Sequence, residues 1–421
     1  MSSLSVLELS DFKSFREAEI ELSSFNLIVG ANASGKSNVR DALRFLHGVA
    51  RGYSLAETLG GRYQEGVQVW SGIRGGSREV CRHGTNRFRL AVNVRGYRYE
   101  LAVEVPRRKG AVPRIADEKL SSLMGGQLYG TKRPSTAAQD HMDVLLAGGG
   151  NYKKGQKRTM ARSQPALTRI EDWIEEAERT DAKAVDIRLA ARAILTALRG
   201  LRFLDISPDA MRIPSIPGET HLGDRGENLS SVIQHLCRDD RLQRAFAAWV
   251  QRLTPMDVAG FDFATDAAGK ILLELVETDG NKTSANSASD GTLRFLALLT
   301  ALLAPDSGHT FFLEEIDNGI HPARLDLLMQ LLRRQTGKDK TTVVATTHSP
   351  PLLRLLGSEH LDQAFISYRL EGHAETRLKC LDSVPSIRRV LEKNDLAALH
   401  ESSWFQNVLA FTEDESEENG E

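Results

Sequence analysis

Cysteine and long apolar runs are scarce in this sequence, and each shortage excludes a class of protein. Only 3 of the 421 residues are cysteine, and they lie far apart, so we expect neither a disulfide framework nor a metal site of closely spaced thiolates. The longest apolar run, residues 293–304, is too short to span a bilayer and contains Arg294. No basic segment followed by an apolar one opens the chain. We therefore expect a cytoplasmic protein with no membrane partner.

Neither sign of charge is in clear excess. The formal net charge is -2, and because the charges are unevenly placed this value neither indicates nor excludes a nucleic-acid partner. A composition of 41% hydrophobic and 26% charged residues is typical of a soluble globular protein. The length is sufficient for one large domain or two ordinary ones, each with its own core.

A complete phosphate-binding loop, Gly-Ala-Asn-Ala-Ser-Gly-Lys-Ser, occupies residues 30–37. An apolar run precedes it as a predicted strand, and a helical pattern follows it, which is the context that such a loop requires. The glycines let backbone N–H groups and the positive end of the helix point at a phosphate. We predict that Lys36 reaches the β- and γ-phosphates of ATP as a catalytic residue and that the Ser37 hydroxyl binds Mg²⁺. The other loop residues predicted to bind the nucleotide are Gly30, Ala33, Ser34 and Gly35.

Two adjacent carboxylates follow another predicted buried strand, residues 311–313. Strand ends in a parallel sheet border the ligand crevice, and two carboxylates placed there require something positive nearby. We predict that Glu314 holds Mg²⁺, directly or through water, and that Glu315 orients and deprotonates the attacking water. An ordinary acidic strand end is the alternative interpretation.

Two weaker signals complete the predicted site. The β-branched run 341–345 delivers His348 to the same edge of the sheet, where it is more plausible as a γ-phosphate sensor than as a structural histidine. Ser289, Asp290 and Gly291 stand directly before the apolar helix of residues 293–304. They either cap this helix or, with its positive end, also bind the γ-phosphate.

A basic region surrounds a predicted β-hairpin formed by residues 88–94 and 97–105. It is either a solvated strand face or a surface for the phosphate backbone of DNA. Residues 125–159 are rich in Gly, Ser and Lys and predict a mobile basic loop, and residues 167–198 predict helices. The basic residues of the hairpin region are Arg82, Arg87, Arg89, Arg95, Arg98, Arg107, Arg108 and Lys109.

Four motifs in this order resemble the ATP-binding-cassette ATPase heads of the RecF, SMC and OLD group. The phosphate loop with Asn32 and Asn38 resembles that group's GxNxxGKSN, which adds both asparagines to the predicted nucleotide-binding residues. Residues 289–292 resemble a shortened signature motif, and residues 347–350 resemble the switch histidine. Residues 314–322 resemble the EEPENGLHP of Walker B and the D-loop, with Ile316 and Asp317 in place of Pro and Glu.

The resemblance implies a homodimer in which two heads enclose two ATP molecules, so that the Ser289 region of one chain completes the phosphate-loop site of the other. It places the family's glutamine loop at either Gln64 or Gln68. There is no zinc-hook CxxC, no long coiled coil and no acidic cluster resembling the Toprim nuclease. Any nuclease or other effector is therefore expected to be a separate chain.

The predicted fold is α/β, a P-loop NTPase of the ABC-ATPase-head type with a mixed central sheet, an antiparallel β lobe and a helical insertion. The predicted divisions are residues 1–120, 121–240, 241–395 and a tail of 396–421 that ends in acidic residues. The leading hypothesis is an ATP hydrolase that dimerises around ATP and acts in DNA repair or anti-phage defence. One alternative is a slow nucleotide-switched protein that sequesters or releases a protein partner. A transporter-energising ATPase is the least favoured, because the gap between the phosphate loop and Ser289 is long.

Overall fold

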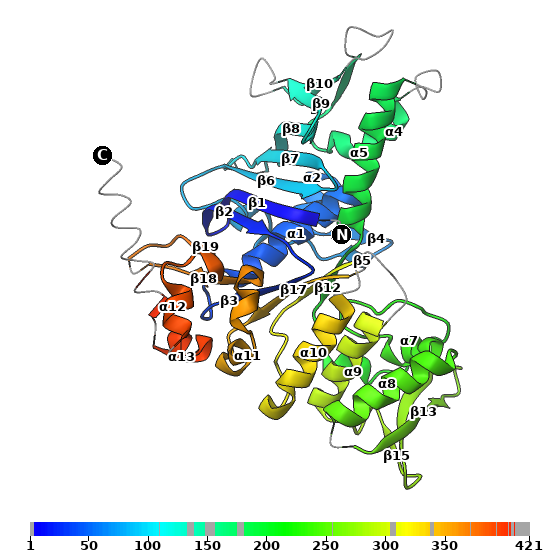
Figure 1. The fold of residues 1–421 in the computed structure, drawn as a ribbon. Helices are drawn as coiled ribbons and strands as arrows, with labels where there is room; N and C mark the ends of the chain where they lie inside the picture. The colour runs from blue at the N-terminus through cyan, green and yellow to red at the C-terminus, as the bar shows by residue number, and fades with distance from the viewer. Residues whose placement is uncertain are drawn as a thin grey trace.

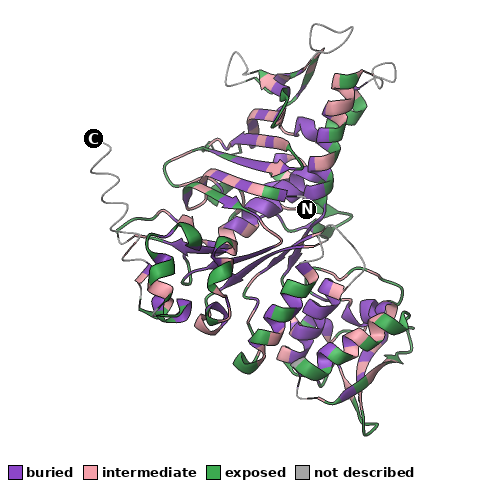
Figure 2. Ribbon diagram, viewed as in Figure 1, coloured by how far each residue is buried: buried purple, intermediate pink, exposed green. Residues whose placement is uncertain are grey.

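Five parallel strands of largely apolar sequence form the centre of the molecule (Figure 1). The six-stranded sheet has the order β12 (Leu201–Leu204), β16 (Thr310–Leu313), β17 (Thr342–Thr347), β3 (Phe25–Val29), β18 (Ala364–Tyr368) and β19 (Arg377–Cys380), of which only β19 is antiparallel. Every residue of β3, β16, β17 and β18 is buried (Figure 2), as expected for strands covered on both faces. The predicted mixed central sheet is confirmed.

This computed structural model describes only part of the chain. The described residues are 4–108, 110–132, 139–147, 156–174, 181–254, 256–303, 309–336, 341–370, 372–392, 394–402, 404–405 and 408. The predicted acidic tail and Lys109 lie outside these residues. No helix within the described ranges combines the length and the apolar character needed to cross a membrane.

An antiparallel sheet lies above the parallel one in Figure 1. Its order is β11 (Gln156–Ala161), β10 (His141–Leu146), β9 (Gly126–Lys132), β8 (Arg114–Ser122), β7 (Tyr97–Glu104), β6 (Arg87–Val94), β1 (Leu4–Phe12) and β2 (Phe15–Glu21). The predicted hairpin is confirmed as β6–β7. Its two turn residues, Arg95 and Gly96, have φ of 49° and 83°, the left-handed values that a two-residue hairpin turn requires.

The mobile loop predicted for residues 125–159 is wrong where the structure describes this stretch, because β9, β10 and the start of β11 occupy it. Alternation in β10, where Met142, Val144 and Leu146 are buried, marks a half-buried strand that the many Gly and Lys residues obscured in the sequence. The antiparallel sheet thus continues to Ala161, past the expected limit at residue 120. The predicted helices of this region are η1 (Ala166–Arg169), α4 (Ile170–Trp173) and α5 (Ala182–Arg199).

Helix α1 (Lys36–Ala50) follows the phosphate loop and packs between the two sheets. Most of its residues are buried, and α5 packs beside it. The chain then forms α2 (Leu55–Gly60), the exposed ribbon of β4 (Arg62–Gln64) and β5 (Val67–Trp70), and the short helix α3 (Gly76–Glu79). This segment returns the chain to the phosphate loop before β6 begins.

A second lobe carries the remaining helices and a small sheet (Figure 1, lower right). It contains α6 (Pro208–Met211), α7 (Leu229–Leu236), α8 (Asp240–Leu253), α9 (Asp290–Leu303), α10 (Leu325–Thr336), and the strands β13 (Val258–Thr265), β14 (Ile271–Glu277) and β15 (Lys282–Ser284). The chain then returns to the parallel sheet and adds α11 (Pro350–Arg354), α12 (Ile387–Leu391) and α13 (Leu396–Glu401).

Candidate nucleotide-binding site

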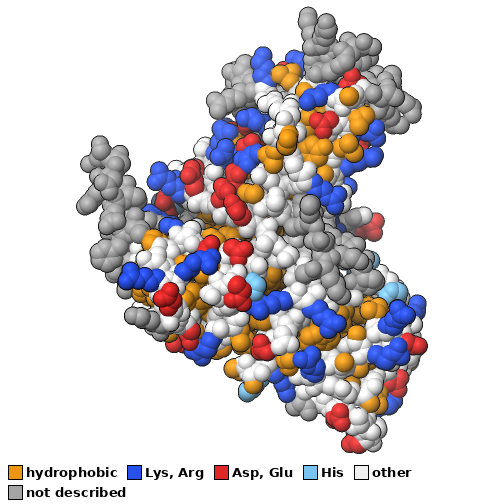
Figure 3. Space-filling view, in the orientation of Figure 1, with side chains coloured by type: hydrophobic (Ala, Val, Ile, Leu, Met, Phe, Trp, Pro, Cys, Tyr) orange, Lys and Arg blue, Asp and Glu red, His pale blue; other side chains and the backbone are white. Residues whose placement is uncertain are grey.

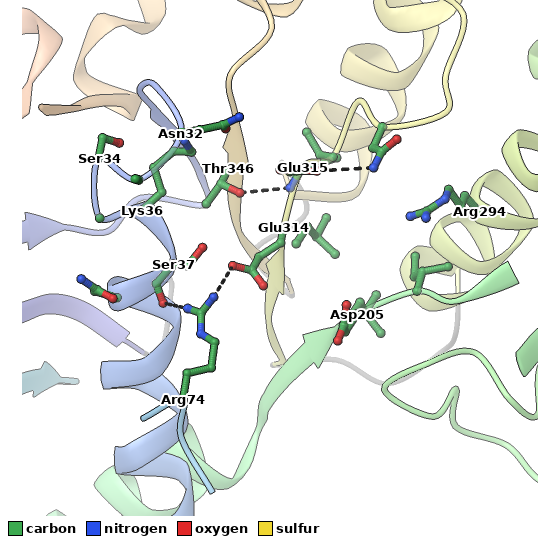
Figure 4. Close-up of a pocket in the computed structure, with 18 of the residues that line it drawn as sticks. Asn32, Ser34, Lys36, Ser37, Arg74, Asp205, Arg294, Glu314, Glu315 and Thr346 are labelled. Carbon is green, nitrogen blue, oxygen red and sulfur yellow. Dashed lines mark hydrogen bonds and ion pairs between the residues drawn. The ribbon is translucent and has the colours of Figure 1, made fainter. Parts of the chain in front are cut away.

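A cavity of about 690 Å³ lies at the carboxyl-terminal edge of the parallel strands (Figure 4). This is the edge at which α/β proteins bind ligands, because the loops that follow neighbouring strands meet there. The phosphate loop, β12, β16, β17 and α9 contribute to its walls. The predicted site residues that line it are Asn32, Ala33, Ser34, Gly35, Lys36, Ser37, Asn38, Glu314 and Glu315.

The phosphate loop holds its lysine against its own backbone. Lys36 Nζ donates to the carbonyl oxygens of Gly30 at 2.7 Å and Ala31 at 2.8 Å. Burial lowers the pKa of Lys36, while Glu315 and Glu314 act in the opposite direction. A lysine held by two carbonyls in a cavity can exchange them for phosphate oxygens, which are stronger acceptors.

Close packing behind the loop explains two of its glycines. A Cβ on Gly30 would lie 2.3 Å from the Ser367 carbonyl oxygen, and Gly35 has φ of 101° with Thr376 directly behind it. Ser367 Oγ donates to the Ser34 carbonyl at 2.8 Å, so β18 supports the loop from the rear. Packing against Ser367 and Thr376 therefore fixes the shape of the loop.

The side chains of Asn38 and Ser34 differ in what they contact. Asn38 Nδ2 donates to Ser14 Oγ at 2.7 Å, so this side chain joins α1 to the turn between β1 and β2. Ser34 Oγ is buried and has no hydrogen-bond partner among the described residues. An orphaned buried hydroxyl inside a phosphate-loop cavity fits a nucleotide phosphate as the missing partner.

Arginines surround the predicted magnesium ligands. Arg40 Nε lies 3.5 Å and Arg74 Nη1 lies 3.8 Å from the Glu314 carboxylate, and Arg74 also donates to the Ser37 carbonyl oxygen (Figure 4). Both distances to Glu314 are longer than a good hydrogen bond. The arginines therefore offset the charge of the carboxylate without occupying its oxygens. Ser37 and Glu314 both line the cavity and carry oxygen atoms of the kind that Mg²⁺ prefers as ligands.

Glu315 has an uncommon backbone conformation beside the switch histidine. Its φ is 47°, a left-handed value that is strained for a glutamate and is typical of functional positions. Its N–H donates to Thr346 Oγ1 at 3.0 Å, and its carboxylate lies 3.9 Å from His348 Nδ1. Nearly half of each side chain is exposed, 45% for Glu315 and 47% for His348, so a water molecule can reach both.

The structure does not bring the signature residues to the phosphate loop of the same chain. Ser289 Oγ accepts from the Thr292 N–H at 3.1 Å and caps α9, as predicted, while Asp290 pairs with Arg212 at 2.7 Å. Gly291 packs so closely on the D-loop that a Cβ would lie 2.3 Å from the Gly319 carbonyl oxygen. Ser289 and Asp290 are exposed and do not line the cavity.

Four charged residues of the cavity were missed at the sequence level: Arg74, Asp205, Arg294 and Arg369. Arg74 stands between glycines at residues 72 and 75–76, and a lone basic residue in such a stretch was the available signal. Neither Gln64 nor Gln68 lines the cavity, since both lie on the exposed β4–β5 ribbon. The tentative glutamine-loop positions therefore find no support in the geometry.

Comparison with known proteins defines the class. The chain belongs to the family described as "AAA domain, putative AbiEii toxin, Type IV TA system", whose model matches residues 25–354. Its family and fold are those of P-loop ATPases, and the order of its motifs is that of the ABC-type heads of SMC-like and RecF-like proteins, as predicted.

Individual relatives are more distant. The chromosome partition protein Smc of Methanocaldococcus jannaschii is 36% identical over 87 residues, which is 20% of this chain and 7% of that protein. The chain thus spans a small fraction of that relative's length. Among solved structures, the chain is similar to an Smc head bound to the C-winged helix domain of ScpA, with a TM-score of 0.46, 14% identity, and 89% and 96% of the two chains covered. An Smc head domain with an extended coiled coil, bound to the C-terminal domain of ScpA derived from Pyrococcus furiosus, gives a TM-score of 0.43, 13% identity, and 93% and 100% coverage.

Proposed function

We propose that this protein binds and hydrolyses ATP with Mg²⁺, forms a homodimer around the nucleotide, and uses this cycle in DNA transactions such as repair or anti-phage defence. The observation that carries the proposal is that three motifs far apart in the sequence, at Lys36, Glu315 and His348, meet at one edge of the parallel sheet. Chance matches to each motif would have no reason to meet there.

The geometry supports a division of labour among these residues. Backbone N–H groups of the loop and Lys36 bind the β- and γ-phosphates, while Ser37 and Glu314 hold Mg²⁺, which neutralises charge on the phosphate oxygens. Glu315 orients a water molecule and accepts its proton, since its carboxylate is half-exposed beside the cavity. His348, 3.9 Å from that carboxylate, contacts the γ-phosphate from the same side.

The dimer follows from the position of the α9 N-terminus. Ser289 and Asp290 are exposed and stand outside the cavity of their own chain, so their capped helix end is available to the nucleotide of a second copy. ATP then joins the two heads, and hydrolysis releases them, which is a population shift driven by the ligand. An effector such as a nuclease, if one acts downstream, is a separate partner chain.

The DNA part of the proposal rests on charge at one end of the basic hairpin. Carboxylates already balance several of its arginines: Arg82 pairs with Asp11 at 2.7 Å, and Arg98 pairs with Glu100 at 3.2 Å. Figure 3 shows this mixture of blue and red side chains over the antiparallel sheet. The strand face is therefore the solvated surface that was one of the two interpretations.

Unbalanced positive charge remains at the open end of the hairpin, in a groove of about 720 Å³. Among the described residues, the side chains of Arg78 and Arg108 have no ion-pair or hydrogen-bond partner, and the Arg107 side chain reaches only the Thr85 carbonyl oxygen at 3.2 Å. The described lining has no Phe, Tyr or Trp on which a base could stack. Such a groove suits sequence-independent contact with a nucleic-acid backbone.

The test is steady-state ATP hydrolysis by the purified chain, with and without double-stranded DNA. We expect DNA to stimulate the wild type, R107A/R108A to lose the stimulation but keep basal turnover, and the matched pair R241A/R244A on α8 to behave as wild type. Lys36→Ala and Glu315→Gln should abolish turnover in every condition. If Glu315→Gln keeps or strengthens binding to a protein partner while DNA has no effect on the wild type, the nucleotide-switched alternative replaces the DNA hypothesis.

A further inference from the structure

Four cations line the nucleotide cavity, and three of them are engaged by the protein itself. Lys36 donates to loop carbonyls, Arg74 pairs with Asp41 and donates to the Ser37 carbonyl oxygen, and Arg369 Nε donates to Thr376 Oγ1 at 3.3 Å. The fourth, Arg294, has no hydrogen bond or ion pair with any residue that the structure describes. A guanidinium has five N–H donors, so an unpaired one in a half-buried position indicates a missing acceptor.

The aliphatic part of the Arg294 side chain is packed in place, although its guanidinium has no partner among the described residues. Gly319 of the D-loop has φ of 77°, and a Cβ built there would lie 3.2 Å from Arg294 Cδ, so the D-loop backbone packs directly on this side chain. The guanidinium extends from α9 toward the cavity (Figure 4). None of the three carboxylates that line the cavity, Asp205, Glu314 and Glu315, forms an ion pair with it in the described structure.

The phosphate loop and Arg294 occupy different walls of the cavity. Lys36 and the loop lie on one side, while Arg294 reaches in from α9 on the other side (Figure 4). A triphosphate held by the loop through its β-phosphate therefore directs its terminal phosphate toward the second wall. Negative charge on that phosphoryl group is what an arginine stabilises during transfer.

We propose that Arg294 is a catalytic residue that contacts the γ-phosphate in the site of its own chain, whereas Ser289 and Gly291 at the start of the same helix serve the site of the partner copy. The inference rests on the proposed ATPase function. It adds a catalytic residue and states which chain's nucleotide that residue contacts. Helix α9 then carries a contact for the partner's nucleotide at its first turn and a contact for its own nucleotide immediately after. One helix joins the two sites.

The first test separates turnover from binding. We expect Arg294→Ala to lower kcat by about 100-fold, the usual effect of removing one donor from a developing negative charge, with the affinity for a non-hydrolysed ATP analogue changed by less than about threefold. Arg294→Lys should recover only part of kcat, because an ammonium lacks the planar fork. Arg241→Ala, on the exposed face of α8, is the matched control and should equal the wild type. A kcat for Arg294→Ala within about threefold of wild type would overturn the proposal.

The second test asks in which chain Arg294 acts, by mixing inactive variants. Lys36→Ala mixed with Ser289→Arg should regain activity, because a mixed dimer contains one intact phosphate loop and one intact signature from different chains. Lys36→Ala mixed with Arg294→Ala should stay inactive, because the only intact phosphate loop then shares its chain with the altered arginine. Recovery in this second mixture would overturn the assignment to the same chain.

The two mixtures also distinguish the inference from the function on which it rests. If Lys36→Ala with Ser289→Arg gives no recovery, the composite dimer site of the proposed function fails. The kcat of Arg294→Ala alone still decides whether Arg294 acts in catalysis. Thermal melting of each variant at the wild-type temperature confirms that lost activity is not lost folding.

Discussion

Two carboxylate sites in this protein have opposite surroundings. Glu118, on β8, is completely buried, and its oxygens accept four hydrogen bonds and meet no lysine or arginine among the described residues. Glu314 and Glu315, at the end of β16, are partly exposed, and their charged neighbours stand 3.5 to 3.9 Å away. At the first site both carboxylate oxygens accept hydrogen bonds from the protein, and the second site is left open.

The difference shows what each site does. The donors to Glu118 are the hydroxyls of Tyr99 at 3.1 Å and Tyr129 at 2.8 Å and the N–H groups of Ala166 at 2.7 Å and Leu167 at 2.9 Å. Burial raises the pKa of Glu118, although these four bonds act in the opposite direction. Because the N–H groups belong to the start of η1, the carboxylate fastens this helical segment to the sheet. A filled carboxylate is structural, whereas an open one can bind a ligand.

The largest effect is expected at the open site. Glu315→Gln should lower kcat for ATP about 1,000-fold, because the amide cannot accept a proton from water. The melting temperature should stay at the wild-type value, since Glu315 receives only one weak side-chain hydrogen bond, from Asn318 at 3.4 Å. ATP turnover and thermal melting measured on one preparation check both parts. Turnover close to wild type would show that this carboxylate is no more functional than Glu118.

Glu118→Gln should give the reverse pattern. The glutamine amide cannot accept the bonds that one carboxylate oxygen receives, and buried donors are left unpaired, so we expect a loss of about 2–4 kcal/mol in stability. ATP turnover per folded molecule should not change. Glu100→Gln on the neighbouring strand, whose partly exposed carboxylate pairs with Arg98 at 3.2 Å and with Arg89 at 3.7 Å, is the matched control and should cost less than about 1 kcal/mol. Equal losses in the two variants would contradict the structural role of Glu118.

His47 extends the comparison to a buried base. Its Nδ1 lies 2.7 Å from the Leu198 carbonyl oxygen, and burial lowers its pKa from 6.5 to about 4. Between pH 6.5 and 4 the unfolded chain therefore binds a proton at His47 and the folded chain does not. The free energy of unfolding is unaffected by this histidine above pH 6.5 and falls as the pH drops through this window. We expect a loss of about 2 kcal/mol between pH 7 and pH 5.

His47→Asn tests that loss, because the amide retains a donor for Leu198 without the titrating ring. Denaturant unfolding at the two pH values should show a smaller difference for the variant than for the wild type. The same difference in both would mean that other groups cause the acid sensitivity.

The smallest effects distinguish paired from unpaired arginines. Arg89→Ala removes half of an exposed ion pair and should change stability by less than about 1 kcal/mol and leave DNA affinity unchanged. Arg108→Ala, in the groove, should weaken DNA binding and reduce the slope of log affinity against log salt by about 1, the value for one phosphate contact. Equal salt slopes for the two variants would show that the groove does not contact DNA.

The strand end that carries Glu314 and Glu315 could be predicted from the sequence, whereas the burial of Glu118 could not. Glu314 and Glu315 follow a run of three apolar residues, so both the strand and its exposed end are local features of the chain. Glu118 lies in an alternating strand among other polar residues, and its partners come from β7, β9 and η1, up to 49 residues away. Only tertiary pairing shows that it is buried. For the same reason Arg294 was missed, because nothing local to this arginine marks the cavity that it lines.

Strands β3, β16 and β17 were likewise predicted from their apolar runs, and the hairpin β6–β7 from its turn. Strands β9 to β11 were not, because short half-buried strands separated by glycine-rich connections have the composition of a loop. The strands that border the cavity were therefore predicted better than strands β9 to β11 of the antiparallel sheet.

The most direct test of the central claim is single-turnover ATP hydrolysis by the wild type, Glu315→Gln and Glu118→Gln, each loaded with ATP and corrected for the folded fraction. The account predicts that all three bind ATP, that the wild type and Glu118→Gln convert it at the same rate, and that Glu315→Gln retains it unconverted. Conversion by Glu315→Gln at the wild-type rate, or failure of the wild type to bind ATP, would contradict the assignment of this cavity as an ATP-hydrolysing site.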